Sequence, residues 1–170
     1  PFNGSAPALN AVLGGHGAER FDSGRVLQNV KAGKPTPPAV APVPAVPPEV
    51  EQSAAQWPLA NKDYGNTRAT TDSQINAGNV NQLGVAWTFK LQGASKWGSA
   101  AGGTLIANNI VYFQDLQSNI YAFDLATGGV IWQKIYGRSA FGPNGPGIGW
   151  GKLFLQDGID KVIALDLNSG

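Results

Sequence analysis

A repeat of 42 residues in the C-terminal part of the chain is the feature that most constrains its fold. When Asp124 is aligned with Asp166, residues 103–128 match residues 145–170 without a gap, and eight of the 26 pairs are identical. A period of this length, built from short strands, is typical of one blade of a β-propeller. The identical residues of the first copy are Gly103, Ile106, Gln114, Asp115, Ala122, Asp124, Leu125 and Gly128.

The two copies of the repeat predict two small antiparallel sheets. The first copy predicts strands over residues 104–106, 110–114, 119–124 and 129–136, and residues 145–170 predict three-quarters of a second blade. The predicted fold class is all-β: a partial β-propeller of about two four-stranded blades, from a ring of seven or eight, preceded by an extended proline-rich N-terminal arm.

Seven residues of the repeat are expected to have structural roles. Each aspartate should end a strand and accept amide hydrogen bonds from the following turn, in which glycine tolerates a positive φ. Each tryptophan should pack between neighbouring blades, because an open-faced blade must bury its apolar surface on the next one. These residues are Trp87, Asp124, Thr127, Gly128, Trp132, Asp166 and Gly170.

Two blades cannot close a ring, so we expect further polypeptide to complete the propeller. Residues 85–91 alternate well enough for a strand, and they would form the outer strand of a blade that the far end of the chain completes. Before them, residues 72–76 predict a short helical turn capped by Thr71 or Asp72.

The composition excludes several classes of function. Only 14% of the residues are charged and the formal net charge is +1, which gives no electrostatic basis for binding nucleic acid. The absence of cysteine excludes disulfides, thiolate metal sites and iron–sulfur clusters. No apolar run approaches the ~20 residues needed to span a bilayer.

The N-terminal third is expected to be organised differently from the repeat. Residues 1–34 form an arm of unknown fold that contains His16, interpreted as a loop residue. Residues 35–56 are interpreted as a linker, because seven prolines within residues 35–50 favour an extended polyproline spacer. The propeller segment is expected over residues 57–170.

Two segments resemble the quinoprotein dehydrogenases, eight-bladed propellers that bind pyrroloquinoline quinone (PQQ). Residues 122–132, AFDLATGGVIW, resemble the tryptophan-docking motif of that superfamily. A longer stretch is similar to the opening of its members, through Trp57, Asn61, Asp63, Tyr64, Thr67, Arg68, residues 74–76, Asn79, Val80, Leu83, Ala86 and Trp87.

The resemblance implies PQQ and calcium as cofactors, held by a glutamate and an arginine, with an adjacent-cysteine disulfide beside the quinone. This chain has residues 99–102, SAAG, at the position of the glutamate, and Asn144, Gly145 and Pro146 where relatives have an arginine. Arg138 lies nearby and is interpreted as an exposed loop residue. We therefore identify no catalytic residue and no metal ligand in this segment, and its cofactor-binding residues stay unknown.

Three functions follow as alternatives. As an enzyme, a periplasmic or extracellular propeller would oxidise an alcohol or sugar and pass electrons to a cytochrome. As a non-enzymatic relative, it would be a scaffold in a membrane-associated complex, similar to the outer-membrane-barrel assembly lipoproteins. In the third, residues 1–56 would wrap a partner through the apolar patches at residues 8–13 and 26–30.

Overall fold

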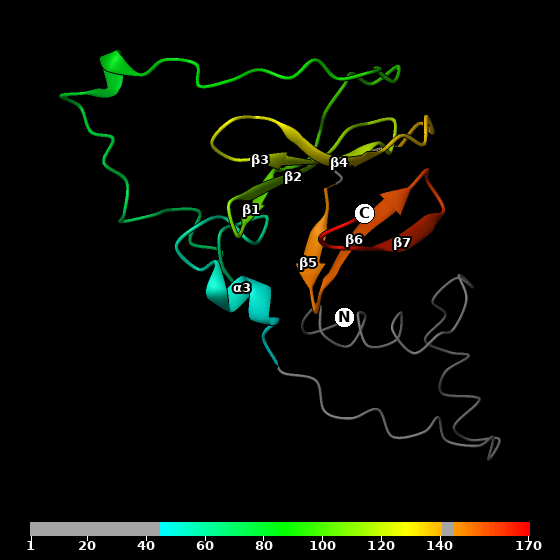
Figure 1. Ribbon diagram of the computed structural model, residues 1–170, viewed down its shortest axis with the longest axis horizontal. Coiled ribbons are helices and arrows are strands. Elements are labelled where there is room, and N and C mark those ends of the chain that lie inside the picture. The colour runs from blue at the N-terminus through cyan, green and yellow to red at the C-terminus, as the bar shows by residue number, and fades with distance from the viewer. Residues whose placement is uncertain (1–44, 141–144) are drawn as a thin grey trace. The chain divides into compact units, whose positions relative to one another are not determined.

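The computed structural model describes residues 45–140 and 145–170, and from Val46 onward they belong to one compact unit. This unit contains two antiparallel sheets, one short α-helix and one 3-10 helix (Figure 1). None of its helices has the length and apolar character needed to cross a membrane. The predicted arm over residues 1–34 lies outside the described residues.

The first sheet consists of four strands in sequential order. Its strands are β1 (Leu105–Ala107), β2 (Ile110–Gln114), β3 (Ile120–Asp124) and β4 (Val130–Lys134). Tyr112 pairs with Ala122, and Ala122 pairs with Trp132, so these three side chains lie side by side on one face. All four strands predicted for the first copy of the repeat are present, with ends that differ by up to two residues.

The second sheet repeats the first with three strands in the same order. Its strands are β5 (Gly147–Gly149), β6 (Lys152–Asp157) and β7 (Lys161–Asp166). Phe154 pairs with Ala164 in the same way that Tyr112 pairs with Ala122, so the sequence offset of 42 is also the structural offset. The prediction of an all-β fold built from partial propeller blades is confirmed.

The main core lies between the two sheets. Because strand residues alternate between faces, Ile110 and Tyr112 point toward the second sheet while Val111 and Phe113 point away from it. The buried residues of this core are Leu105, Ala107, Tyr112, Ile120, Ala122, Trp132, Ile148, Leu153, Leu155 and Leu167.

A second cluster covers the opposite face of the first sheet. There Val111, Tyr121 and Phe123 are buried beneath the alternating side chains of one extended segment, which contributes Trp87, Phe89 and Leu91. Phe89 packs against both rings, with centroid distances of 5.2 Å to Tyr121 and 4.7 Å to Phe123. Residues 85–91 therefore occupy the place of a neighbouring sheet.

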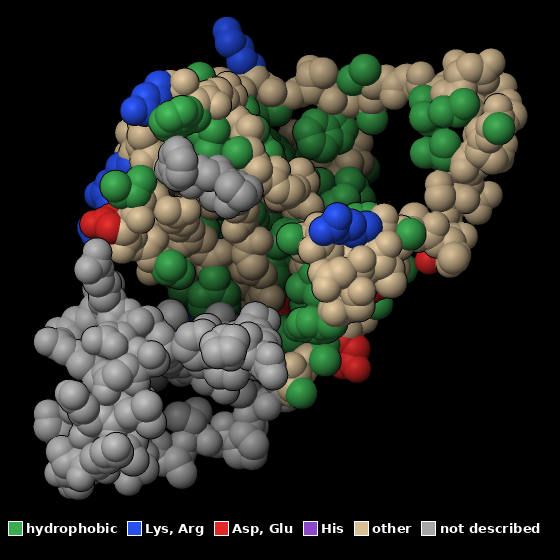
Figure 2. All heavy atoms as spheres, turned by 180° about the vertical axis from the view of Figure 1, so that it is seen from behind, with side chains coloured by type: hydrophobic (Ala, Val, Ile, Leu, Met, Phe, Trp, Pro, Cys, Tyr) green, Lys and Arg blue, Asp and Glu red, His purple; other side chains and the backbone are tan. Residues whose placement is uncertain are grey.

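Residues 85–91 nevertheless form no strand, which corrects that prediction. Their side chains alternate as in a strand, but no described segment pairs with their backbone, and a strand requires a hydrogen-bonded neighbour. Large apolar side chains just before and within the segment are exposed, and Figure 2 shows hydrophobic atoms along this outlying stretch at its upper right. They include Ile75, Val80, Leu83 and Val85.

The helical turn predicted over residues 72–76 is also absent. Asn79 Oδ1 accepts the Asn76 amide hydrogen and Asn76 Oδ1 accepts that of Gly78, and such local bonds compete with helix formation. The only described helical turn in this region is a 3-10 helix, η1 (Val80–Gln82).

The linker predicted over residues 35–56 differs from the structure at its C-terminal end. Helix α3 (Pro48–Gln52) lies within it, and Val50 is buried. Proline is tolerated in the first turn of a helix because the amide that it lacks would have no intrahelical partner there. The proline-rich pattern alone therefore did not distinguish an extended spacer from a helix start, and residues 35–44 lie outside the described part of the chain.

Candidate functional site

Two tryptophans make the same contact on successive repeats. The Nε1–H of Trp87 donates to the carbonyl oxygen of Leu125 at 2.9 Å, and the Nε1–H of Trp132 donates to that of Leu167 at 3.3 Å. Leu125 and Leu167 are equivalent positions of the repeat. Trp132 is 9% exposed, so this contact lies within the core between the two sheets.

The glycine that ends each turn leaves room for these indole rings. Gly128 has φ +70° and Gly170 has φ +81°, in the region that side chains rarely adopt. A Cβ at Gly128 would lie 2.5 Å from Trp87, and one at Gly170 would lie 2.8 Å from Trp132. Glycine is thus needed at both positions for conformation and for space.

The aspartates of the repeat hold the turns that carry these glycines. Asp124 Oδ1 accepts hydrogen bonds from the amide and the hydroxyl of Thr127, both at 2.8 Å. Asp166 Oδ1 does the same with Ser169, both at 3.1 Å. The hydroxyl of Thr127 lowers the pKa of Asp124 most, and the amide of Asn168 lowers the pKa of Asp166 most. Groups held as carboxylates in this way are suited to fixing turns rather than to acid catalysis.

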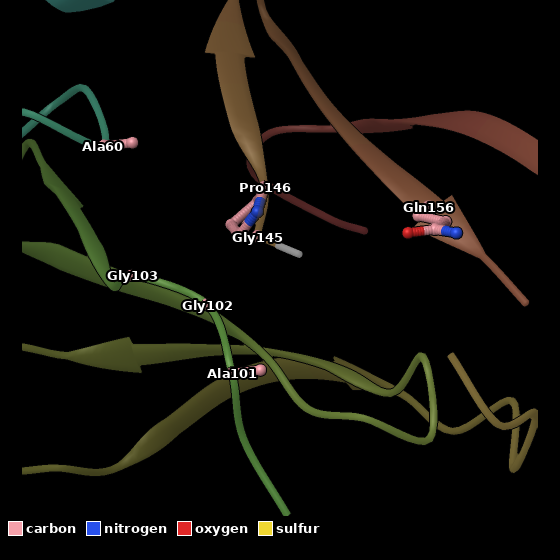
Figure 3. Close-up of a pocket in the computed structure, with 7 residues that line it drawn as sticks. All are labelled: Ala60, Ala101, Gly102, Gly103, Gly145, Pro146 and Gln156. Atoms are coloured by element: carbon pink, nitrogen blue, oxygen red, sulfur yellow. The ribbon is translucent and has the colours of Figure 1, made fainter. Parts of the chain in front are cut away.

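A pocket of about 440 Å³ lies where the chain leads into β1 and β5 (Figure 3). Its lining residues are small apart from Gln156, and none of them carries a charge. The lining includes Ala101, within residues 99–102 where the family resemblance placed the glutamate of a cofactor site, and Gly145, within residues 144–146 where it placed the arginine. Its residues are Ala60, Ala101, Gly102, Gly103, Gly145, Pro146 and Gln156.

Two equivalent glutamines connect the pocket to the core. Gln114 at the end of β2 is fully buried, and its Nε2 donates to the backbone oxygen of Gln156 at 2.5 Å. Among the described residues nothing donates to Gln114 Oε1. This bond crosses from the first sheet to the second, so it holds the strand that presents the Gln156 side chain to the pocket.

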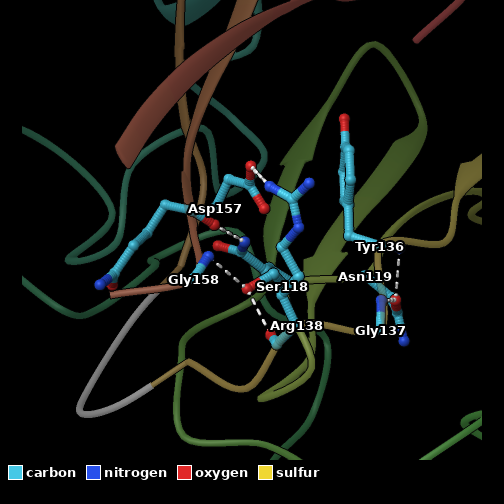
Figure 4. Close-up of polar contacts among 9 residues, drawn as sticks. Ser118, Asn119, Tyr136, Gly137, Arg138, Asp157 and Gly158 are labelled. Carbon is cyan, nitrogen blue, oxygen red and sulfur yellow. Dashed lines mark hydrogen bonds and ion pairs between the residues drawn. The ribbon is translucent and has the colours of Figure 1, made fainter. Parts of the chain in front are cut away.

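A polar cluster joins the same ends of the two sheets (Figure 4). Arg138 Nη1 lies 2.5 Å from Asp157 Oδ2, and the arginine side chain is 54% exposed whereas the aspartate is 6% exposed. The Ser118 hydroxyl donates to the Arg138 carbonyl at 2.8 Å and accepts from the Gly158 amide at 2.9 Å. Arg138 is exposed, as interpreted from the sequence, but its ion pair to the second sheet was not foreseen.

Asp115, the repeat equivalent of Asp157, satisfies its carboxylate within the first sheet. It accepts bonds from the amide and the side chain of Asn119, both at 3.0 Å, and from the Tyr121 hydroxyl at 3.1 Å. Burial, followed by the charge of Asp115, raises the pKa of Tyr121. Asn119 in turn accepts the amides of Tyr136 and Gly137, which shapes the chain after β4.

Sequence reasoning missed the inter-sheet bonds, although three of the residues that take part in them belong to identical pairs of the repeat. Gln114, Gln156, Asp115 and Asp157 are all identical pairs of the repeat, so their identity was a usable signal. Within the described ranges no group of three metal-ligating side chains comes together. His16 lies outside those ranges.

Comparison with known proteins identifies the family. Residues 57–145, more than half of the chain, match the model of the PQQ glucose/ethanol/alcohol dehydrogenase β-propeller domain. This match includes all of the first sheet and five of the seven residues that line the pocket: Ala60, Ala101, Gly102, Gly103 and Gly145.

Individual relatives agree with this assignment. A lanthanide-dependent methanol dehydrogenase of Methylacidiphilum fumariolicum (strain SolV) is 31% identical over 134 residues, which cover 72% of this chain and 21% of the relative. A quinohemoprotein alcohol dehydrogenase of Comamonas testosteroni is 29% identical over 67% of this chain and 17% of the relative.

The solved structures give the same result. The crystal structure of quinohemoprotein alcohol dehydrogenase from Comamonas testosteroni superposes with a TM-score of 0.62, at 27% identity, over 71% of this chain and 19% of that one. The chain thus spans about a fifth of the length of these relatives. With its two repeated sheets, its docked tryptophans and a matching family model, the chain belongs to the PQQ-dependent glucose/ethanol/alcohol dehydrogenase β-propeller family.

Proposed function

We propose that this chain forms the first blades of a PQQ-dependent dehydrogenase that oxidises an alcohol or sugar. The family match over residues 57–145 is the observation that carries the proposal. In the proposed enzyme the two sheets pack on each other through the core and the docked tryptophans. Their facing ends form one wall of the chamber that binds substrate and cofactor. Alcohol is the favoured substrate class, because the relatives are methanol and alcohol dehydrogenases.

Further polypeptide completes the ring in this proposal. Trp87 docks on the first sheet as Trp132 docks on the second, so residues 85–91 correspond to β4 of a preceding blade. The remaining strands of that blade would pair with the backbone of residues 85–91, which no described segment pairs with. On the other side, Val162 of β7 is 60% exposed and faces the position of a third blade.

The described pocket does not by itself fit PQQ. Oxidation of an alcohol by a quinone needs a base for the hydroxyl proton and a cation that polarises the quinone. The pocket lining is uncharged, and Arg138, the nearest arginine in sequence to Gly145, is paired with Asp157. In this proposal the base, the cation and the calcium or lanthanide ligands come from the completing polypeptide. The small residues of this chain contribute a close-fitting wall.

The location and the redox partner belong to the same proposal. We propose a periplasmic or extracellular site for the assembled enzyme and a cytochrome as its electron acceptor. The quinohemoprotein relatives support a cytochrome as electron acceptor, because their names describe a haem together with the quinone.

A test requires the complete polypeptide that contains these blades. It would be incubated with PQQ and either calcium or a lanthanide, then assayed for alcohol-dependent dye reduction and for quinone released by acid, identified by mass. Stoichiometric quinone and turnover are expected. If no quinone is released and no dye is reduced with any of these metals, the dehydrogenase proposal is contradicted.

The uncharged pocket supports a second candidate, a non-enzymatic propeller scaffold in a membrane-associated complex. For this candidate the same experiment should give no quinone and no turnover, while the folded propeller should purify with partner proteins. Bound quinone would exclude it.

A further inference from the structure

The first hairpin of each sheet ends in a turn of two consecutive left-handed residues. Asn108 and Asn109 have φ of 51° and 61° between β1 and β2, and Trp150 and Gly151 have φ of 51° and 71° between β5 and β6. These pairs are equivalent positions of the repeat. Successive amides of such a turn face outward together and can bind oxygen acceptors.

The turn of the second sheet binds a carboxylate from helix α3. Glu49 Oε2 accepts the Trp150 amide at 3.1 Å, and Glu49 Oε1 accepts the Gly151 amide at 2.5 Å. Pro47 lies against Gly149, where an added Cβ would come within 3.1 Å of its ring. A left-handed φ is unusual for a residue as bulky as tryptophan, so the paired carboxylate stabilises a turn that its own sequence disfavours.

The turn of the first sheet binds the chain that follows α3. Ser53 Oγ accepts the Asn108 amide and Gln56 Oε1 accepts the Asn109 amide, both at 3.1 Å. Gln56 Nε2 also donates to Asn109 Oδ1 at 2.6 Å. Immediately afterwards Trp57 and Ile106 exchange backbone hydrogen bonds at 2.8 and 3.1 Å, which adds one bridge to the edge of β1.

Residues 47–57, here called the strap, thus contact equivalent turns of two consecutive sheets. Val50 of the strap is 6% exposed, and α3 contacts both β5 and β1. Lys62 secures its end, because the buried ammonium donates to the carbonyls of Ala54 and Gln56. All but the last residue of the strap precede the region that matches the family model.

We propose that the strap is a positioning element that joins the two sheets and sets their spacing. The pocket residues Gly103 and Pro146 precede β1 and β5, and the strapped turns follow those strands, so the turn contacts of the strap lie at the end opposite the pocket. Because packed sheets behave as rigid layers, fixing them at one end restricts the width of the pocket at the other. The proposal does not depend on PQQ binding.

The first test is amide hydrogen exchange, followed by mass spectrometry on the full chain. Glu49→Ala should accelerate exchange of the Trp150 and Gly151 amides about tenfold or more, because they lose their acceptor. The double variant Ser53→Ala, Gln56→Ala should likewise accelerate exchange of the Asn108 and Asn109 amides. Glu51→Ala is the matched control, since this neighbouring side chain on α3 is exposed. Equal exchange in the Glu49 and Glu51 variants would overturn the assignment of the strap contacts.

A second measurement addresses the spacing itself. The chain has no cysteine, so one introduced cysteine can carry a spin label at Ala101, before β1, and a second at Ile159, after β6. Their distance distribution should broaden in Glu49→Ala and stay narrow in Glu51→Ala. Lost amide protection with an unchanged distribution would show that the strap attaches to the sheets without positioning them, which would overturn the proposal.

Discussion

Trp132 lies directly against Gly170, so closely that a Cβ on that glycine would come within 2.8 Å of the indole. Trp87 bears the same relation to Gly128 one repeat earlier, at 2.5 Å. In both cases the indole nitrogen also donates to a carbonyl three residues before the glycine. The same three-part contact therefore occurs on both faces of the first sheet.

Gly128→Ala should destabilise the fold. The new Cβ would overlap the Trp87 ring and force a left-handed φ on alanine, and overpacking of this kind costs about 1–3 kcal/mol. Thermal or denaturant unfolding of the full chain would measure the loss. Gly84→Ala is the control, because no atom lies within 4 Å of a Cβ built there. Equal stability of the two variants would contradict the docking role of Gly128.

Arg138→Ala should leave a buried carboxylate without its cation. Asp157 is 6% exposed, and a buried polar group left without its partner costs about 1–3 kcal/mol, or more when it is charged. The exposure of Arg138 reduces this loss. Replacing Asp157 by Asn in the Arg138→Ala background should recover part of the loss. A double-mutant cycle with urea unfolding would measure the coupling, and additive effects of the two substitutions would show that the ion pair contributes nothing.

Tyr112→Phe should make the protein more resistant to alkali. Burial raises the pKa of Tyr112 to about 12 from its ordinary value of 10.0. The folded state holds the Tyr112 proton more tightly than the unfolded state does. This contribution to the free energy of unfolding, about 2–3 kcal/mol, is complete below about pH 10 and is lost as the pH rises toward 12. Unfolding free energies at pH 8 to 12 should fall less steeply in the variant.

At neutral pH the same substitution should cost little. The Tyr112 hydroxyl donates to the Leu167 carbonyl at 3.2 Å, but Trp132 donates to that oxygen as well. The oxygen therefore keeps a partner, and we expect a loss below about 1 kcal/mol. Phe154 occupies the equivalent position of the second sheet without a hydroxyl. A loss of several kcal/mol would contradict this account.

Thr127→Val should raise the pKa of Asp124 toward its ordinary value. The Thr127 hydroxyl is the largest cause of the lowered pKa, while the retained amide bond should keep part of the effect. Ser169→Ala should change the pKa of Asp166 less, because backbone amides are its main cause. NMR titration of the carboxyl carbons would measure the pKa values of Asp124 and Asp166 in each variant. Stability from either carboxylate is present above its unfolded pKa and is lost as the pH falls through the folded value.

The repeat made much of the fold predictable. Strand alternation, the turn residues after Asp124 and Asp166, and the spacing of Trp87 and Trp132 are local or periodic signals, and these patterns report which face of a strand is buried. The uncharged character of the pocket wall could also be predicted, because residues 99–102 and Gly145 were recognisable as departures from the family pattern.

Contacts between distant segments could not be predicted in this way. The sequence determined by itself that the chain builds repeated antiparallel sheets, since the hydrophobic period is encoded in neighbouring residues. Only the tertiary structure decided that Glu49 binds the Trp150 turn, that Arg138 pairs with Asp157, and that residues 85–91 have no strand partner among the described residues. Such pairings depend on which surfaces packing brings together, and the local pattern of residues carries no record of that.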